Sequence, residues 1–161
     1  MKEIEALRAE VVQLAKEKNV CVTTAESCTG GLLSGAITAV PGSSAVFRTG
    51  FVTYSNAAKS DLLGVKAELI KQMGAVSEEV AEAMAVRARY LTEADIAIST
   101  TGIAGPGGSE HKPEGRVCFG IAAPAGTGTE TVEFGAVGRA EVRLRSVEHA
   151  LTRLREVLQA I

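Results

Sequence analysis

Short apolar runs typical of buried strands alternate along this chain with segments of helical periodicity. Residues 19–24 (NVCVTT) and 94–105 (ADIAISTTGIAG) have the length and branched side chains of buried strands, and helical patterns precede and follow them. A strand that is apolar on both sides needs a layer of helices on each face of its sheet. The alternation therefore predicts a layered α/β fold.

The two ends of the chain add a strand pair and two long helices. Residues 117–126 and 129–137 read as two strands joined by a glycine turn, which would make the sheet mixed. Helical spacing of apolar residues predicts a helix at each terminus. The first stripe is Ile4, Leu7, Val11 and Leu14, and the last is Val147, Leu151, Leu154, Leu158 and Ile161.

Capping residues divide the middle of the chain. Residues 31–40 form a helical pattern, and residues 45–55 read as a strand. Ser55 is placed to cap a helix over 56–64, which Gly64 would end. Ser77 opens a long helix whose inward-facing residues are expected to be Val80, Met84 and Leu91.

Size and composition exclude several classes of protein. With 161 residues the chain is expected to be one domain, residues 1–161. A net charge of −2, 4% aromatic residues and no Trp argue against nucleic-acid binding. No stretch approaches the roughly 20 apolar residues that cross a bilayer, so no membrane association is expected. Three cysteines without a CxxC pair suit a reducing compartment, and we expect the protein in the cytoplasm.

The polar stretch TTAESCTGG, residues 23–31, joins a strand to a helix and contains Ser27. Ser27 can be a helix N-cap, or a nucleophile whose turn offers backbone N–H groups to an oxyanion. The sequence has two histidines, His111 in a polar loop and His149 in an amphipathic helix. A Ser-His-Asp triad is therefore poorly supported.

If Ser27 reacts, a lysine can accept its proton when burial lowers the lysine pKa. Lys59 lies at the start of a helix that follows the strand over residues 45–55, which we expect to pair with the strand over residues 19–24. An ordinary solvated lysine fits this position as well. Tyr54 can relay a proton or bond to the lysine, or be an aromatic at the edge of the core.

Cys28 is the second candidate nucleophile, because a helix N-terminus lowers a thiol pKa. No imidazole is obviously placed beside it, and a small buried thiol is the simpler interpretation, as for Cys21 and Cys118. Glu26 either orients a ligand or belongs to the turn.

Residues 101–116, TGIAGPGGSEHKPEGR, form a glycine-rich loop that matches neither a Walker nor a Rossmann motif. Its backbone donors can hold a phosphate, with Lys112 or Arg116 adding charge, or it can be a plain surface loop. Arg139 and Arg143 follow at i and i+4, where two guanidiniums can grip a phosphate or be solvated. No cluster has metal-ligand spacing, so no metal is predicted.

Together these motifs resemble one family, the CinA carboxy-terminal domain, over roughly residues 5 to 160. The matching stretches are TTAESCTGG, GFVTYSNAAK, GAVSEEV, TGIAGPGGS with KPEGRV, and GRAEVR. The family includes stand-alone nicotinamide mononucleotide deamidases. The resemblance implies a three-layer α/β/α fold with a mixed sheet and metal-free, cofactor-free hydrolysis of a carboxamide. The substrate would be nicotinamide mononucleotide, giving nicotinic acid mononucleotide and ammonia in pyridine-nucleotide recycling.

Carried onto matching positions, the resemblance makes Ser27 the nucleophile and Lys59 the general base, with Tyr54 assisting. We also expect a homo-oligomer, because small enzymes often complete their sites at interfaces. Substrate contacts are expected from Glu26, Cys28, Thr29, Gly30, Gly31, Thr101, Gly102, Gly105, Arg139 and Arg143.

This sequence departs from the family at Glu114, where relatives usually have an apolar residue, and we expect it to act without the larger amino-terminal domain of fused CinA proteins. Two alternatives stay open. The first is a non-catalytic nucleotide-binding or DNA-uptake-associated module, and the second is an amidase that uses Cys28. A metal-dependent hydrolase is the interpretation that the sequence favours least.

Overall fold

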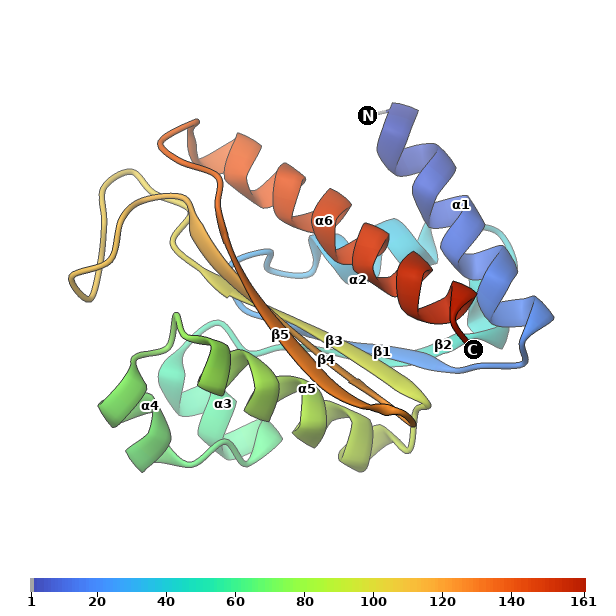
Figure 1. Cartoon of the computed structure of the whole chain (residues 1–161), viewed down its shortest axis with the longest axis horizontal. Coiled ribbons are helices and arrows are strands. Elements are labelled where there is room, and N and C mark those ends of the chain that lie inside the picture. Colours follow the sequence, from blue (N-terminus) through green and yellow to red (C-terminus); the bar gives the residue numbers. More distant parts are fainter. Residues whose placement is uncertain (1) are drawn as a thin grey trace.

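The computed structural model describes residues 2–161, in which five strands form one mixed sheet of order β2-β1-β3-β4-β5 (Figure 1). The central strand β3 pairs parallel to β1 and antiparallel to β4. At the edges, β2 runs parallel to β1 and β5 antiparallel to β4. The strands are β1 (Val22–Glu26), β2 (Phe47–Val52), β3 (Ile96–Gly102), β4 (Arg116–Ala123) and β5 (Gly126–Glu133).

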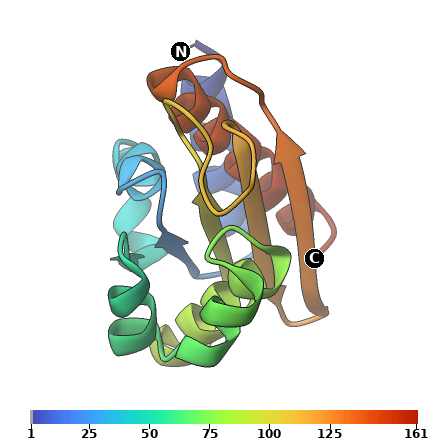
Figure 2. The ribbon, with the colours of Figure 1, turned by 90° about the vertical axis from the view of Figure 1, so that its left-hand side faces the viewer.

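Helices cover both faces of the sheet. One layer holds α1 (Lys2–Glu17), α2 (Leu32–Thr38) and α6 (Arg139–Gln159) (Figures 1 and 2). The other holds α3 (Asn56–Leu63), α4 (Ala67–Met73) and α5 (Glu78–Thr92). The predicted three-layer α/β/α fold with a mixed sheet is therefore confirmed.

Each layer has its own apolar core. Ile4, Leu7 and Val11 of α1 are buried with the last three leucines of α6, so α1 packs on α6, which in turn packs on the sheet. On the opposite face, Val80 and Met84 of α5 are fully buried. Burial of each such side chain contributes about 1.5–3 kcal/mol. Within residues 2–161, no helix combines the length and hydrophobicity needed to cross a membrane.

The predicted caps are confirmed. Ser55 Oγ accepts a hydrogen bond from the Ala58 N–H at 3.0 Å, and Gly64 ends α3 in the left-handed conformation. Ser77 Oγ accepts from the Val80 N–H at 3.2 Å at the start of α5.

Four details of the sequence prediction are wrong. Leu91 is 44% exposed, because it lies in the last turn of α5, beyond the part of the helix that packs on the sheet. Ile161 is 53% exposed, because α6 ends two residues before it. The last strand is Gly126–Glu133 rather than 129–137, and β2 is shorter than 45–55 because a 3-10 turn, Ser43–Ala45, precedes it.

Candidate active site

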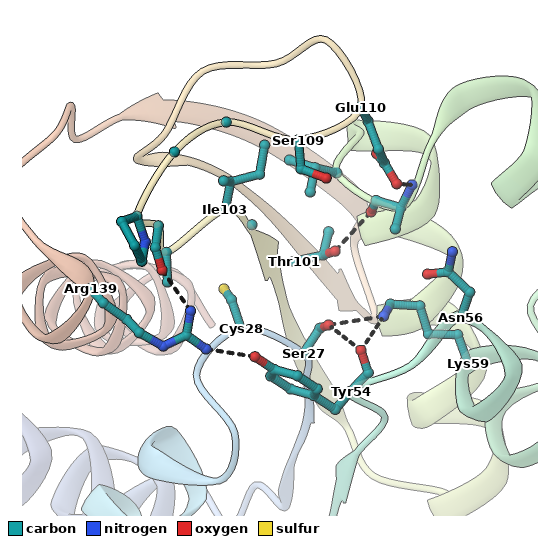
Figure 3. Close-up of a pocket in the computed structure, with 18 residues that line it drawn as sticks. Ser27, Cys28, Tyr54, Asn56, Lys59, Thr101, Ile103, Ser109, Glu110 and Arg139 are labelled. Atoms are coloured by element: carbon teal, nitrogen blue, oxygen red, sulfur yellow. Dashed lines mark hydrogen bonds between the residues drawn. The ribbon is translucent and has the colours of Figure 1, made fainter.

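A cavity of about 370 Å³ lies where the three parallel strands end. The loops that follow β1, β2 and β3 all contribute to its wall, and Arg139 from the start of α6 closes one side (Figure 3). Ligands in open α/β sheets bind outside the carboxyl ends of the strands. The topology therefore brings the polar segments of the sequence to one place.

Ser27 and Lys59 meet at the floor of this cavity. Lys59 Nζ donates a hydrogen bond to Ser27 Oγ at 2.9 Å, and only 1% of Lys59 is exposed (Figure 3). Nζ also lies 3.0 Å from the carbonyl oxygen of Thr53 and 3.4 Å from that of Tyr54. Ser27 follows β1 directly and Lys59 lies in the first turn of α3, so the parallel pairing of β1 with β2 brings them together.

Burial lowers the pKa of the Lys59 amine from 10.5, because a charged ammonium is poorly solvated there. Cys28 and the Glu110 carboxylate act in the opposite direction and raise it. Lys59 is thus a buried lysine whose amine loses its proton more readily than that of a solvated lysine, and the solvated-lysine interpretation is wrong.

Ser27 is not the N-cap of α2. That helix begins at Leu32, and its N-cap is Gly31, which makes no side-chain cap bond. The Ser27 N–H donates to the Thr100 carbonyl at 2.9 Å, so this donor is unavailable to an oxyanion. The Ser27 hydroxyl is left facing Lys59.

Glu26 occupies the backbone donors that we expected to be unpaired at the start of α2. Its carboxylate accepts bonds from the N–H groups of Leu33 at 2.8 Å and Ser34 at 2.9 Å, and from the hydroxyls of Thr29 and Ser34 at 2.6 Å each. Glu26 is fully buried and does not line the cavity. Of the two interpretations of Glu26, the geometry favours the one in which it belongs to the turn.

Tyr54 contributes differently from the expected role. Its backbone carbonyl, rather than its hydroxyl, contacts Lys59. The hydroxyl accepts a bond at 2.7 Å from Arg139, whose guanidinium also donates to the Gly105 carbonyl at 2.7 Å (Figure 3). Arg139 thus joins the loop after β2 to the glycine-rich loop.

Cys28 lines the cavity beside Ser27, with 5% of its surface exposed. Burial raises the pKa of its thiol to about 12, so the thiolate is scarce at neutral pH. The expected effect of a helix N-terminus on this thiol is absent, because α2 begins four residues later.

Arg143 lies behind the cavity rather than in it. It donates to the carbonyls of Cys28 at 3.1 Å and Thr29 at 3.3 Å, and so supports the turn. Arg139 and Arg143 therefore cannot bind the same phosphate in this arrangement, whereas the i, i+4 spacing suggested that they could. Of the expected contact residues, Cys28, Thr101, Gly102, Gly105 and Arg139 line the cavity, whereas Glu26, Thr29, Gly30, Gly31 and Arg143 do not.

The glycine-rich loop is held by its own charged residues. Glu114 accepts a bond from the Gly107 N–H at 2.5 Å, which explains how a carboxylate is accommodated at this position. Gly105 has φ +91, and a Cβ there would lie 2.7 Å from Glu114. Arg116 pairs with Glu133 at 2.6 Å, and Lys112 donates to the carbonyls of Met73 and Val76. Neither cation lines the cavity.

Sequence reasoning missed three polar residues of the cavity wall, Asn56, Ser109 and Glu110. All three lie in or beside stretches that match the family, but their place in the wall depends on how the loops fold back. His111 and His149 lie outside the wall, and His149 pairs with Glu130 at 2.8 Å. In residues 2–161 no three His, Cys, Asp or Glu side chains are grouped so that they could hold a metal ion.

Comparison with known proteins agrees with this architecture. The sequence profile described as the CinA C-terminal domain matches residues 4–158. The solved structure of competence/damage inducible protein CihA from Agrobacterium tumefaciens superposes with a TM-score of 0.93 at 45% identity, covering 98% of this chain and 96% of that one. A CinA superfamily protein from Klebsiella pneumoniae superposes with a TM-score of 0.94 at 34% identity, covering 98% and 99%.

Curated relatives are of two lengths. The CinA-like protein of Chloroherpeton thalassium is 48% identical over 158 residues, and the match covers 96% of this chain but only 38% of that protein. The nicotinamide-nucleotide amidohydrolase PncC of Enterobacter agglomerans is 47% identical over 160 residues, which is 98% of both chains. PncC of Escherichia coli K12 is 47% identical over 94% of this chain and 93% of its own length. The chain therefore belongs to the CinA C-terminal domain family.

Proposed function

We propose that this protein hydrolyses the carboxamide of nicotinamide mononucleotide to nicotinic acid mononucleotide and ammonia. The observation that carries the proposal is the 2.9 Å contact between Lys59 Nζ and Ser27 Oγ at the floor of the cavity. The names of full-length relatives, nicotinamide-nucleotide amidohydrolase, support the choice of substrate. The reaction would serve pyridine-nucleotide recycling.

In this mechanism the neutral Lys59 amine is the general base. When the amine is neutral, its two N–H bonds can be directed at the carbonyls of Thr53 and Tyr54, and its lone pair then accepts the Ser27 proton, which reverses the direction of the 2.9 Å bond that protonated Lys59 donates to Ser27 Oγ. The Ser27 oxygen attacks the amide carbon, and the Lys59 ammonium then protonates the departing nitrogen, which leaves as ammonia. Water, deprotonated by Lys59, hydrolyses the acyl-enzyme and frees Ser27.

The substrate phosphate is assigned to the side of the cavity that Arg139 closes. Arg139 is the one arginine of the cavity wall, and its contact with the Gly105 carbonyl sets it beside the glycine-rich loop. A guanidinium and backbone donors are suited to a phosphate. Turnover of nicotinamide riboside, which lacks the phosphate, is expected to be much slower than that of the mononucleotide. Equal turnover of both compounds would show that Arg139 does not bind the substrate phosphate.

The defining experiment is to incubate the purified protein with nicotinamide mononucleotide, without added metal, and to measure ammonia. Ser27→Ala is expected to lose about 10³-fold or more in turnover while the fold is retained. Cys28→Ala is the matched control at the neighbouring position and is expected to stay active. An active Ser27→Ala enzyme with an inactive Cys28→Ala enzyme would instead identify the thiol as the nucleophile. Binding of the nucleotide without any ammonia would favour the non-catalytic module.

We further propose that the protein acts in the cytoplasm as a homo-oligomer. Three free cysteines suit a reducing compartment. The apolar faces of α1 and α6 are covered within the chain, so an oligomer would have to use other surfaces. Light scattering of the purified protein measures its mass, and the mass of a single chain would exclude the oligomer.

A further inference from the structure

Residues 104–108 of the glycine-rich loop form part of the cavity wall, together with Arg139. Backbone hydrogen bonds fix the chain on either side of this segment, at Ile103 and at Ser109. Within the segment, residues 2–161 provide two hydrogen bonds, and each involves a side chain from outside it, Glu114 in one case and Arg139 in the other. These two side chains are therefore the polar anchors of this part of the wall.

Glu114 is the anchor outside the cavity. Its carboxylate accepts a hydrogen bond from the Gly107 N–H at 2.5 Å, and Glu114 does not line the cavity itself. The same side chain lies against Gly105, where an added Cβ would come within 2.7 Å of it. Glu114 thus holds the stretch from Gly105 to Gly107 from behind the wall.

Arg139 contacts the same stretch from the cavity. Its guanidinium donates to the Gly105 carbonyl at 2.7 Å and to the Tyr54 hydroxyl at 2.7 Å (Figure 3). These contacts use only part of the donor set of a guanidinium, so other N–H groups stay free for a ligand. The Gly105 carbonyl helps to set the direction of those free donors, and Glu114 helps to set where that carbonyl lies.

We propose that Glu114 is a positioning residue for the substrate phosphate, because it fixes the Gly105 carbonyl that orients Arg139. The inference rests on the proposed function, since it needs the phosphate at Arg139. A guanidinium that is already held in the bound geometry binds a phosphate more tightly, because less conformational freedom is lost on binding. The negative charge of Glu114 opposes a phosphate, so any gain in affinity must pass through the loop.

Binding to the Ser27→Ala protein tests this without turnover. Dissociation constants of nicotinamide mononucleotide and of nicotinamide riboside, which lacks the phosphate, are measured by calorimetry. Adding Glu114→Ala removes one hydrogen bond, and we expect it to weaken binding of the mononucleotide about fivefold and to leave that of the riboside nearly unchanged. Glu114→Gln keeps an oxygen that can accept the Gly107 bond, so its constant is expected to stay within about twofold of that of Ser27→Ala alone.

Two comparisons separate positioning of the phosphate site from a general structural role. In a protein that also carries Arg139→Gln, Glu114→Ala is expected to cause no further loss, because the residue through which it acts is gone. Glu79→Ala removes an exposed carboxylate of α5 outside the cavity wall and is the control, expected to alter neither constant.

Three results would overturn the proposal. Equal losses for the mononucleotide and the riboside would show that Glu114 supports the cavity as a whole. An unchanged or tighter mononucleotide complex in Glu114→Ala would show that the phosphate site does not need this anchor. A loss that persists in the Arg139→Gln protein would show that Glu114 acts by another route. Failure of the proposed function looks different: the wild-type protein would release no ammonia from the mononucleotide, whatever the dissociation constants are.

Discussion

At the scale of single residues, the proposed chemistry depends on a lysine and a serine that share a buried position. Lys59 is 1% exposed and Ser27 is 7% exposed, yet both line a cavity that a ligand can enter. Burial favours the neutral amine, and the adjacent hydroxyl gives that amine a proton to accept. The residues alone left both roles open, and the family resemblance singled out this pair, whose side chains meet because β1 and β2 are parallel neighbours. The sequence could not predict that Arg139 binds the Tyr54 hydroxyl, because that contact depends on where α6 begins in space.

Burial of Lys59 makes stability depend on pH. Its folded-state pKa lies below 10.5, so between that lowered value and 10.5 the unfolded chain binds a proton that the folded chain does not. Stability therefore rises with pH across this window. Lys59→Met removes the effect. Urea unfolding at several pH values is expected to show the wild type gaining stability relative to Lys59→Met as pH rises, and a flat or falling difference would contradict the lowered pKa.

Cys28 is expected to be a poor nucleophile despite its position in the cavity wall. With a thiol pKa of about 12, only about one thiol in 10⁵ is ionised at pH 7. Alkylation by iodoacetamide at neutral pH should therefore be far slower than for a free cysteine, and mass spectrometry of the peptide containing Cys28 measures the rate. Rapid alkylation of Cys28 would contradict a buried, protonated thiol.

At the scale of secondary-structure elements, the turn after β1 is built around a buried carboxylate. The alternation of strands and helices predicted β1, α2 and the turn between them. It did not predict that Glu26 accepts bonds from N–H groups in the first turn of α2, because a buried carboxylate on the last residue of a strand has no distinctive spacing. By occupying these donors, Glu26 fixes α2 against the turn that presents Ser27.

Glu26→Gln tests this role. An amide nitrogen in place of one oxygen would face hydrogen-bond donors, so we expect a loss of about 2–3 kcal/mol in the free energy of unfolding. Turnover should fall as well, because the turn that holds Ser27 is no longer anchored. Denaturant unfolding measures the first effect, with Glu79→Gln as an exposed control. A stability loss equal to that of the control would show that the carboxylate is not needed.

At the scale of the whole molecule, the site and the core occupy different parts of the same elements. The loops after β1, β2 and β3 form the cavity, whereas α6 contributes Arg139 at its start and core leucines in its second half. The layers were predictable from helical and strand periodicity. The cavity wall was predictable only in part, since Glu110 reaches it through a loop whose path no periodicity specifies.

Core packing should therefore be separable from catalysis. Leu154 of α6 is fully buried in the core cluster that α6 shares with α1 and one face of the sheet, so Leu154→Ala is expected to cost about 2–5 kcal/mol in the free energy of unfolding. At a temperature where the variant stays folded, its kcat should remain near the wild-type value. A marked loss of kcat in folded Leu154→Ala would mean that the α6 core and the site are coupled.

Ammonia release by Lys59→Arg tests the role of Lys59 most directly. Arginine keeps the positive charge and the donors of a protonated lysine, but it does not lose a proton at any accessible pH. If neutral Lys59 takes the Ser27 proton, the folded variant should release ammonia from nicotinamide mononucleotide about 10²–10⁴ times more slowly. Near-normal turnover by Lys59→Arg would show that position 59 supplies charge rather than a base.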